Sequence, residues 1–390
     1  MTTPQQETSQ TEFTRLVDLA SRRLGASVVA ANDEGFAERE NLIKPEPARF
    51  QPYTFGHKGQ VMDGWETRRR REPGHDWAIV RLGVPGVVRG VVVDTAFFTG
   101  NYPPEISVEG AAVEGYPSPS ELEQADWVPL VPRSAIGGDR QNAFPVEVLE
   151  RVTHVRLCMY PDGGVARLRV YGDVVADPRF FAAGAVDLVA LVNGGTVVGC
   201  SNMHYSSPTA LISPGEARVM GEGWETARRR DDANDWVEFA LAAPGVVRLA
   251  ELDTSYFVHN APGWATLRGR DARDTAHDWI ELLPRTRLQP DTRHRFRLTA
   301  GPEITHVRLD VFPDGGLARV RLFGDLSAHG RVELGLRWLN TLPAAAARQL
   351  LEHECALDTT EAEKIIAGRP VTDPTALPDT VRALVTGETR

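Results

Sequence analysis

The chain has 390 residues, of which 42% are hydrophobic and 25% charged, an ordinary globular composition long enough for two or three domains. Its formal net charge of -10 argues against a general nucleic-acid binder, because phosphate neutralisation needs a basic field. The polar N-terminus has no apolar signal-peptide segment, and no stretch approaches the ~20 apolar residues of a membrane span. We therefore expect a cytoplasmic protein without nucleic-acid or membrane partners.

In chain order, the first fifteen residues predict a flexible N-terminus, and residues 12–20 have a short helical pattern. Three alternating, β-branched runs at 77–84, 90–98 and 153–160 predict strands. The string "PDGG" at 161–164 is turn chemistry and predicts a hairpin. Its glycines are expected to be structural, because such turns need positive φ.

The chain contains an internal duplication. "GWETRRRREPGHDW" at 64–77 and "GWETARRRDDANDW" at 223–236 are identical at nine of fourteen positions. "THVRLCMYPDGGVARLRVYGD" at 153–173 matches "THVRLDVFPDGGLARVRLFGD" at 305–325 at fourteen of twenty-one. Repeats of this length indicate whole domains rather than solenoid units.

Short strands separated by Gly and Pro turns favour an all-β fold, with two tandem jelly-roll β-sandwiches. We place the first repeat at 16–175 and the second at 184–328. Broken helical stretches after residue 335 predict a short helical C-terminal extension at 335–390.

Four consecutive arginines follow Trp65 in an acidic protein, and three interpretations compete. The run is a solvated strand edge, a nucleic-acid contact, or a pocket for a small carboxylate, to which Arg presents a planar fork. The overall charge disfavours the second interpretation. The neighbouring acids and aromatics, which a solubilising run does not need, favour the third, as does "DTAFFTGNYPP" (94–104) at a strand end.

The segment at 31–47 is rich in ionisable residues and has no clean helical or strand period. It is either a charged surface loop or a site-forming loop that supplies a carboxylate base and an ammonium. Its counterpart at 200–216 lacks nearly all those charges. The ionisable set therefore lies in the first repeat, which predicts one dominant site there.

Over about 16–330, the chain resembles the allantoicases (allantoate amidinohydrolases). The resemblance is carried by "NDEGFAERENLIKP", "DGWETRRRR", "HDWAIVRLG", "DTAFFTGNYPP", "SNMHYSSP" and "GEGWETARRR". It implies two tandem jelly rolls similar to galactose-binding domains, and hydrolysis of allantoate to ureidoglycolate and urea in purine degradation. The second repeat departs from the pattern, with Asn234 in place of His75.

Allantoate is a small carboxylate whose central carbon bears two ureido groups, so arginines could clamp it while carboxylates or His manage protons. The candidate catalytic residues are Asp33, Glu34, Lys44, Glu66 and His75. The candidate substrate-binding residues are Arg68, Arg69, Arg70, Asp94, Asn101 and His204.

No cofactor is evident from the sequence. The three cysteines have no paired spacing, and no zinc motif is present, so the metal is unknown, and a carboxylate-bound divalent ion stays open. The rival function is a non-catalytic binding module for a small polar ligand or sugar. A third possibility is a scaffold that has lost its catalytic activity. We expect the protein to bind a small-molecule substrate. We also expect it to form a homo-oligomer.

Overall fold

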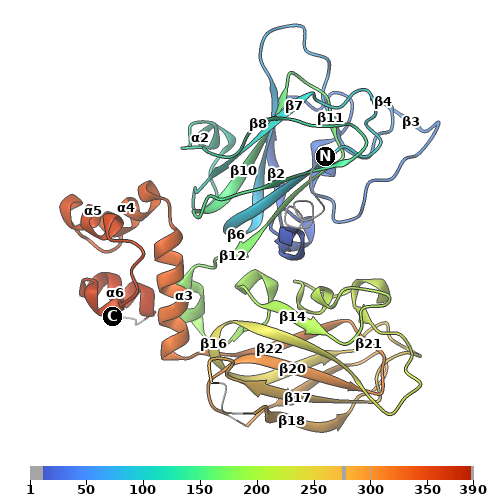
Figure 1. Cartoon of the computed structure of the whole chain (residues 1–390), viewed down its shortest axis with the longest axis vertical. Coiled ribbons are helices and arrows are strands. Elements are labelled where there is room, and N and C mark those ends of the chain that lie inside the picture. Colours follow the sequence, from blue (N-terminus) through green and yellow to red (C-terminus); the bar gives the residue numbers. More distant parts are fainter. Residues whose placement is uncertain (1–11, 275–277, 300, 388–390) are drawn as a thin grey trace, which may run out of the picture. The chain divides into compact units, whose positions relative to one another are not determined.

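The computed structural model describes residues 12–274, 278–299 and 301–387. The expected flexible N-terminus lies, up to residue 11, outside the described residues. The chain divides into two compact units, of which the first is mainly residues 1–175 and the second mainly 176–340 with 351–390. Each contains one eight-stranded antiparallel β-sheet system, so the predicted tandem all-β fold is confirmed (Figure 1).

The first repeat has twelve strands and a few short helices. Its strands are β1 (Val17–Asp18), β2 (Ser27–Ala31), β3 (Phe55–Gly56), β4 (Gly59–Gln60), β5 (Trp65–Glu66), β6 (Asp76–Asp94), β7 (Glu105–Ala111), β8 (Val128–Ala135), β9 (Gln141–Pro145), β10 (Arg151–Tyr160), β11 (Gly164–Val165) and β12 (Arg167–Val174). Its helices are the short α2 (Pro119–Glu123) and the 3-10 turns η1 (Glu12–Arg15), η2 (Arg22–Leu24) and η3 (Arg39–Ile43).

The second repeat has the same strand order. Its strands are β13 (Val186–Asp187), β14 (Thr196–Cys200), β15 (Trp224–Glu225), β16 (Asp235–Asp253), β17 (Trp264–Arg270), β18 (Ile280–Arg287), β19 (Arg293–Arg297), β20 (Ile304–Phe312), β21 (Gly316–Leu317) and β22 (Arg319–Leu326). Its 3-10 turns are η4 (Pro178–Ala183), η5 (Leu191–Asn193), η6 (Pro208–Ile212) and η7 (Met220–Glu222). The order β1-β12-β6-β10-β7-β8 recurs as β13-β22-β16-β20-β17-β18.

The nineteen-residue strand β6 joins the two layers of the first sandwich. Its first half pairs with β2 and β10, and its second half with β12 and β9. The pairing with β10 jumps from Arg81 to Gly86, around Pro85, which has no amide proton to donate. A Cβ on Gly86 would lie 2.3 Å from the Asp173 carbonyl oxygen, so the bend requires glycine there.

The hairpin predicted at "PDGG" is wrong. Strands β10 and β12 each pair with β6, and the intervening β11 pairs with β5 instead. The turn therefore carries the chain from one half of β6 to the other. The structural role of its glycine is nevertheless clear, since Gly163 has φ +148° and its Cβ would lie 2.6 Å from the Pro103 nitrogen.

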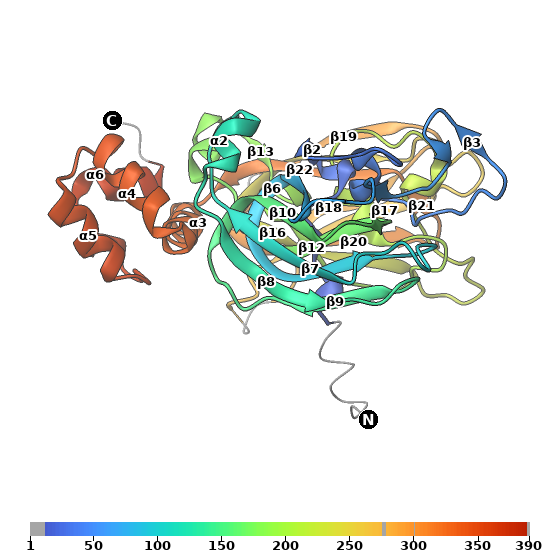
Figure 2. The ribbon, with the colours of Figure 1, turned by 90° about the horizontal axis from the view of Figure 1, so that it is seen from above.

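The C-terminal helices begin earlier than the sequence pattern predicts, at residue 328 rather than 335. They are α3 (Ala328–Thr341), α4 (Ala344–His353), α5 (Thr359–Ala367) and α6 (Asp379–Thr386), with the 3-10 turn η8 (Pro374–Ala376). Gly330 and Gly335 weaken the helical pattern of α3, but each marks a close backbone approach. Their Cβ atoms would lie 2.0 Å from the Pro244 oxygen and 1.9 Å from the Val385 oxygen. Helices α3, α5 and α6 lie together beside one end of the second sandwich (Figures 1 and 2).

Candidate active site

The tryptophan that precedes the arginine run is a buried anchor. Trp65 is fully buried, and its indole Nε1 donates to the Asp33 carbonyl at 2.8 Å. Trp224 of the second repeat donates in the same way to the Asn202 carbonyl, also at 2.8 Å. Because both repeats have this bond, it serves the fold of both units rather than a site in one of them.

Two of the predicted arginines are held by carboxylates of their own unit. Arg68 donates through Nε to Asp33 at 2.7 Å, and Arg70 donates through Nη1 to the buried Asp76 at 2.6 Å. Strand β5 ends at Glu66, so the arginines follow the strand rather than form part of it. The Arg70 pair recurs as Arg229 with Asp235 at 2.8 Å.

The arginine between them is exposed. In the described part of the chain, the Arg69 guanidinium makes no hydrogen bond or ion pair. The contacts of Arg68 and Arg70 support a structural role for these two of the four arginines.

Asp33 shapes the loop that follows β2. Its carboxylate accepts from the backbone nitrogens of Gly35 and Arg68, at 2.9 and 2.8 Å. Burial alone would raise the pKa of Asp33, but these bonds and the Arg68 side chain outweigh it, so the pKa lies below its usual value. Asn202 makes the corresponding backbone bonds in the second repeat, to His204 and Ala227.

Glu66 and Asn101 form a further duplicated contact. Asn101 donates to the Glu66 carboxylate at 2.7 Å, as Asn260 does to Glu225 at 2.6 Å. Burial raises the pKa of Glu66 above its usual value, and the Asn101 hydrogen bond only partly opposes this. The pairs hold the loop after the long strand against β5 or β15.

Each of the remaining candidates makes its own local contacts. Asp94 accepts from the Ala96 nitrogen at 2.9 Å, and Glu34 accepts from the Arg39 nitrogen at 3.2 Å. The His75 ring packs 4.9 Å from that of Tyr160, and burial, followed by the nearby Arg156, lowers its pKa. His204 belongs to the second unit, where it is exposed beside Tyr205.

An open pocket of about 440 Å³ lies in the first repeat beside these loops. Lys44 is the one predicted site residue that lines it. The other charged lining residues are Glu38, Glu46, Arg49, Lys58, Asp63 and Arg167, accompanied by Asn41, Gln51, His57 and Gln60. The volume and the mixed polar lining suit a small polar molecule.

The pocket lies on an insertion that the second repeat lacks. Twenty residues separate Ile43 from Gly64, but only ten separate Ile212 from Gly223. The extra residues include the hairpin β3–β4, labelled in Figure 1, which supplies lining residues 56–60. This length difference was the sequence signal that could have located the pocket.

Asp63, which lines the pocket, binds two cationic side chains and one backbone nitrogen. It accepts from Lys44 Nζ at 3.0 Å, from the Arg49 backbone nitrogen at 2.9 Å and from Arg167 Nη2 at 2.8 Å. Burial opposes its ionisation, but the hydrogen bonds of Arg167 and Lys44 prevail, and its pKa lies below the usual value. Arg167 is only 1% exposed and also donates to the Glu46 and Asp63 carbonyls.

A second ion pair lies in the pocket wall. Lys58 Nζ contacts the Glu38 carboxylate at 2.8 Å and donates to the Glu34 carbonyl at 2.7 Å. The Lys58 hydrogen bond lowers the pKa of Glu38, whose side chain is still 52% exposed. Glu38 is therefore an ionised carboxylate accessible from the pocket.

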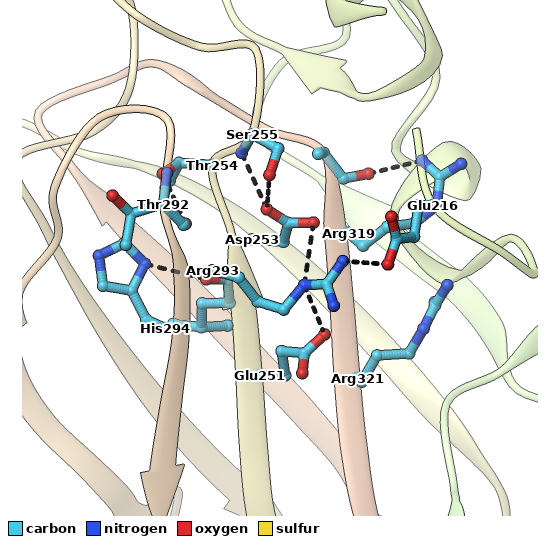
Figure 3. A network of polar contacts seen from close by, with 12 residues as sticks. Glu216, Glu251, Asp253, Thr254, Ser255, Thr292, Arg293, His294, Arg319 and Arg321 are labelled. Atoms are coloured by element: carbon cyan, nitrogen blue, oxygen red, sulfur yellow. Dashed lines mark hydrogen bonds and ion pairs between the residues drawn. The ribbon is translucent and has the colours of Figure 1, made fainter. Parts of the chain in front are cut away.

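The corresponding face of the second repeat is occupied by its own side chains. Arg319 is the counterpart of Arg167 and donates to the matching carbonyls of Gly215 and Glu222. Figure 3 shows Arg293 reaching from β19 between three carboxylates: Glu216 at 2.5 Å, Glu251 at 3.4 Å and Asp253 at 3.8 Å. The first repeat has proline, valine and glutamine at the positions of Glu216, Glu251 and Arg293, namely Pro47, Val92 and Gln141.

Within the described ranges, no group of three or more His, Cys, Asp or Glu side chains is arranged to hold a metal ion. No helix in those ranges is long and apolar enough to span a membrane.

The Allantoicase repeat family model matches residues 17–175 and 186–327. The chain belongs to the allantoicase family. It is 59% identical to a "Probable allantoicase" of Nocardia farcinica, over 80% of this chain and 95% of the relative. A second, from Streptomyces coelicolor, is 54% identical over 85% of this chain and 91% of the relative.

Solved structures agree with this assignment. The crystal structure of allantoicase from Saccharomyces cerevisiae matches with a TM-score of 0.71 at 33% identity, covering 83% of this chain and 98% of that one. The recognised family and the tandem fold are thus confirmed, and the chain is a hydrolase of the allantoicase type.

Proposed function

We propose that the chain hydrolyses allantoate to ureidoglycolate and urea, and that the reaction takes place in the pocket of the first repeat. The observation that supports this site is the pocket itself, built on an insertion of the first repeat and lined by Lys44. The bond from the central carbon to one ureido nitrogen breaks, and that nitrogen takes up a proton and leaves as urea. The oxygen of water bonds to the same carbon and gives up a proton.

Glu38 is the group we assign to proton removal from the attacking water. It is accessible, and Lys58 keeps it ionised by lowering its pKa. Lys44 is positioned by Asp63 at 3.0 Å and can donate a hydrogen bond to the leaving ureido oxygen. Asp33, Glu66, Arg70, Asp94 and Asn101 are assigned to holding the surrounding loops, because their contacts are made within the fold.

The direct test is urea release from allantoate by the purified protein. Replacing Lys44 by Gln should lower kcat/KM roughly 10- to 100-fold, the cost of one charge-assisted hydrogen bond of about 1.5–3 kcal/mol. The matched control is Ser213→Ala, at the position of the second repeat that corresponds to Lys44. Equal losses in both variants would argue for two working sites, and wild-type kinetics of the Lys44 variant would exclude this pocket.

The helical extension is proposed to take no part in the chemistry, because the matched family repeats end at residue 327. A chain ending at residue 327 should release urea at the full-length rate when activity is normalised to folded protein, measured by circular dichroism. Loss of turnover in a folded truncated chain would assign the extension a role in the site.

A cytoplasmic location and a homo-oligomeric state are further proposals. The strongly exposed aromatic side chains of Tyr53 and Phe55, at 92% and 70%, support an interface on the insertion.

A further inference from the structure

The four cationic side chains that line the pocket differ in what they bind. Lys44 and Arg167 contact Asp63, and Lys58 contacts Glu38. In the described part of the chain, the guanidinium of Arg49 makes no hydrogen bond or ion pair, although it lines the pocket and is exposed. Its charge is thus available to an incoming ligand.

The backbone of Arg49 is held while its side chain is not. Its backbone nitrogen donates to Asp63 Oδ2 at 2.9 Å, which ties this residue to the carboxylate that also binds Lys44 and Arg167. The next residue, Phe50, stacks on Phe97 with ring centroids 5.8 Å apart. The start of the guanidinium side chain is therefore fixed beside the pocket, which reduces the entropy lost when it binds.

We propose that Arg49 binds the carboxylate of the substrate and makes the pocket specific for carboxylate-bearing ureides. This inference rests on the proposed function of the pocket. A guanidinium offers two parallel N–H donors to a carboxylate, whereas the ammonium of Lys offers a point charge. Arg49 takes the role that the sequence pattern suggested for the arginines at 68–70.

The second repeat gives an internal comparison. The counterpart of Arg49 is Arg218, whose backbone nitrogen donates to Glu222 as that of Arg49 donates to Asp63, but whose guanidinium is itself bound by the Glu222 carboxylate. An arginine with a free guanidinium is thus a property of the repeat that contains the pocket.

The experiment compares steady-state kinetics of Arg49→Gln and Arg49→Lys with allantoate and with its neutral carboxamide analogue. For Arg49→Gln, KM for allantoate should rise roughly 10- to 100-fold with little change in kcat, as expected for a lost charge-assisted pair. For Arg49→Lys the increase should be partial. Neither variant should change kcat/KM for the carboxamide, because that analogue has no carboxylate to bind.

The matched control is Arg71→Gln, which removes another exposed arginine that does not line the pocket and should leave KM unchanged. An unchanged KM for allantoate in Arg49→Gln, with Lys44→Gln still impaired, would overturn the role of Arg49 alone. Wild-type kinetics in both variants would overturn the pocket as the site. An equal rise for acid and carboxamide would also overturn carboxylate recognition.

Discussion

Glu38→Gln should lower kcat by about 10²- to 10⁴-fold with a smaller effect on KM, because an amide cannot take the proton of the attacking water. The measurement is steady-state urea release. Glu40→Gln is the control, since Glu40 is an exposed carboxylate in η3, the 3-10 turn that Glu38 precedes, and does not line the pocket. Comparable losses in the two variants would point to a general effect of charge on the loop.

The same assignment has a pH signature. The pKa of Glu38 is lowered by its hydrogen bond to Lys58, so wild-type kcat/KM should stay high below the usual pKa of a glutamate and fall only as Glu38 protonates. Lys58→Met removes that hydrogen bond, which raises the pKa of Glu38 and moves the acid limb of the profile to higher pH. An unmoved acid limb would contradict Glu38 as the base.

Arg167→Gln should reduce the free energy of unfolding by about 3–5 kcal/mol, because it leaves Asp63 without the buried partner that compensates its desolvation. Arg167 is 1% exposed and also satisfies the carbonyl oxygens of Glu46, Asp63 and Ala166. The measurement is denaturant unfolding at neutral pH. Arg23→Gln is the control: its ion pair with Glu46 is exposed and 3.7 Å long, so its loss should cost less than about 1 kcal/mol.

The Asp63 contacts also set the sign of a pH effect on stability. The folded-state pKa of Asp63 lies below its unfolded value, so the stabilisation is complete above the unfolded pKa and is lost as pH falls through the folded one. Arg167→Gln should therefore be less sensitive to acid between these two values than the wild-type protein. If the two unfolding curves shift with pH in parallel, Asp63 does not carry this dependence.

The fold was predictable from the sequence because the same strings recur in both halves of the chain and so mark the two repeats. Matching strings such as "THVRL" and "PDGG" identified the repeats, and alternation identified β10; the runs predicted at 77–84 and 90–98 are parts of one long strand, β6, which ends at Asp94. The pairing of the strands was harder to predict from the sequence. Strands β10 and β12 follow each other closely in the sequence, yet each pairs with β6. Short-range turn chemistry cannot distinguish a hairpin from a turn that joins different halves of one long strand.

The candidate site was predictable only in part, for a related reason. Lys44 could be identified from the charged loop, but the partners of Arg68 and Arg70 depend on which carboxylates the fold brings beside them. Asp33 lies 35 residues from Arg68 in sequence, and only the fold shows that it takes up this charge. Lys58 lies in an insertion without a distinctive motif, and Arg49 lies just before it, so only the fold shows that both side chains line the pocket.

In the ion network of the second repeat, a side chain of the protein occupies the position between the carboxylates that a bound cation would take. Arg293 is attached to β19, so its guanidinium faces Glu216, Glu251 and Asp253 at an effective concentration that a freely diffusing small molecule does not reach. Any external cation would have to compete with this tethered group, and any external anion would meet three carboxylates. The charges on this face of the second repeat are therefore already paired within the repeat itself.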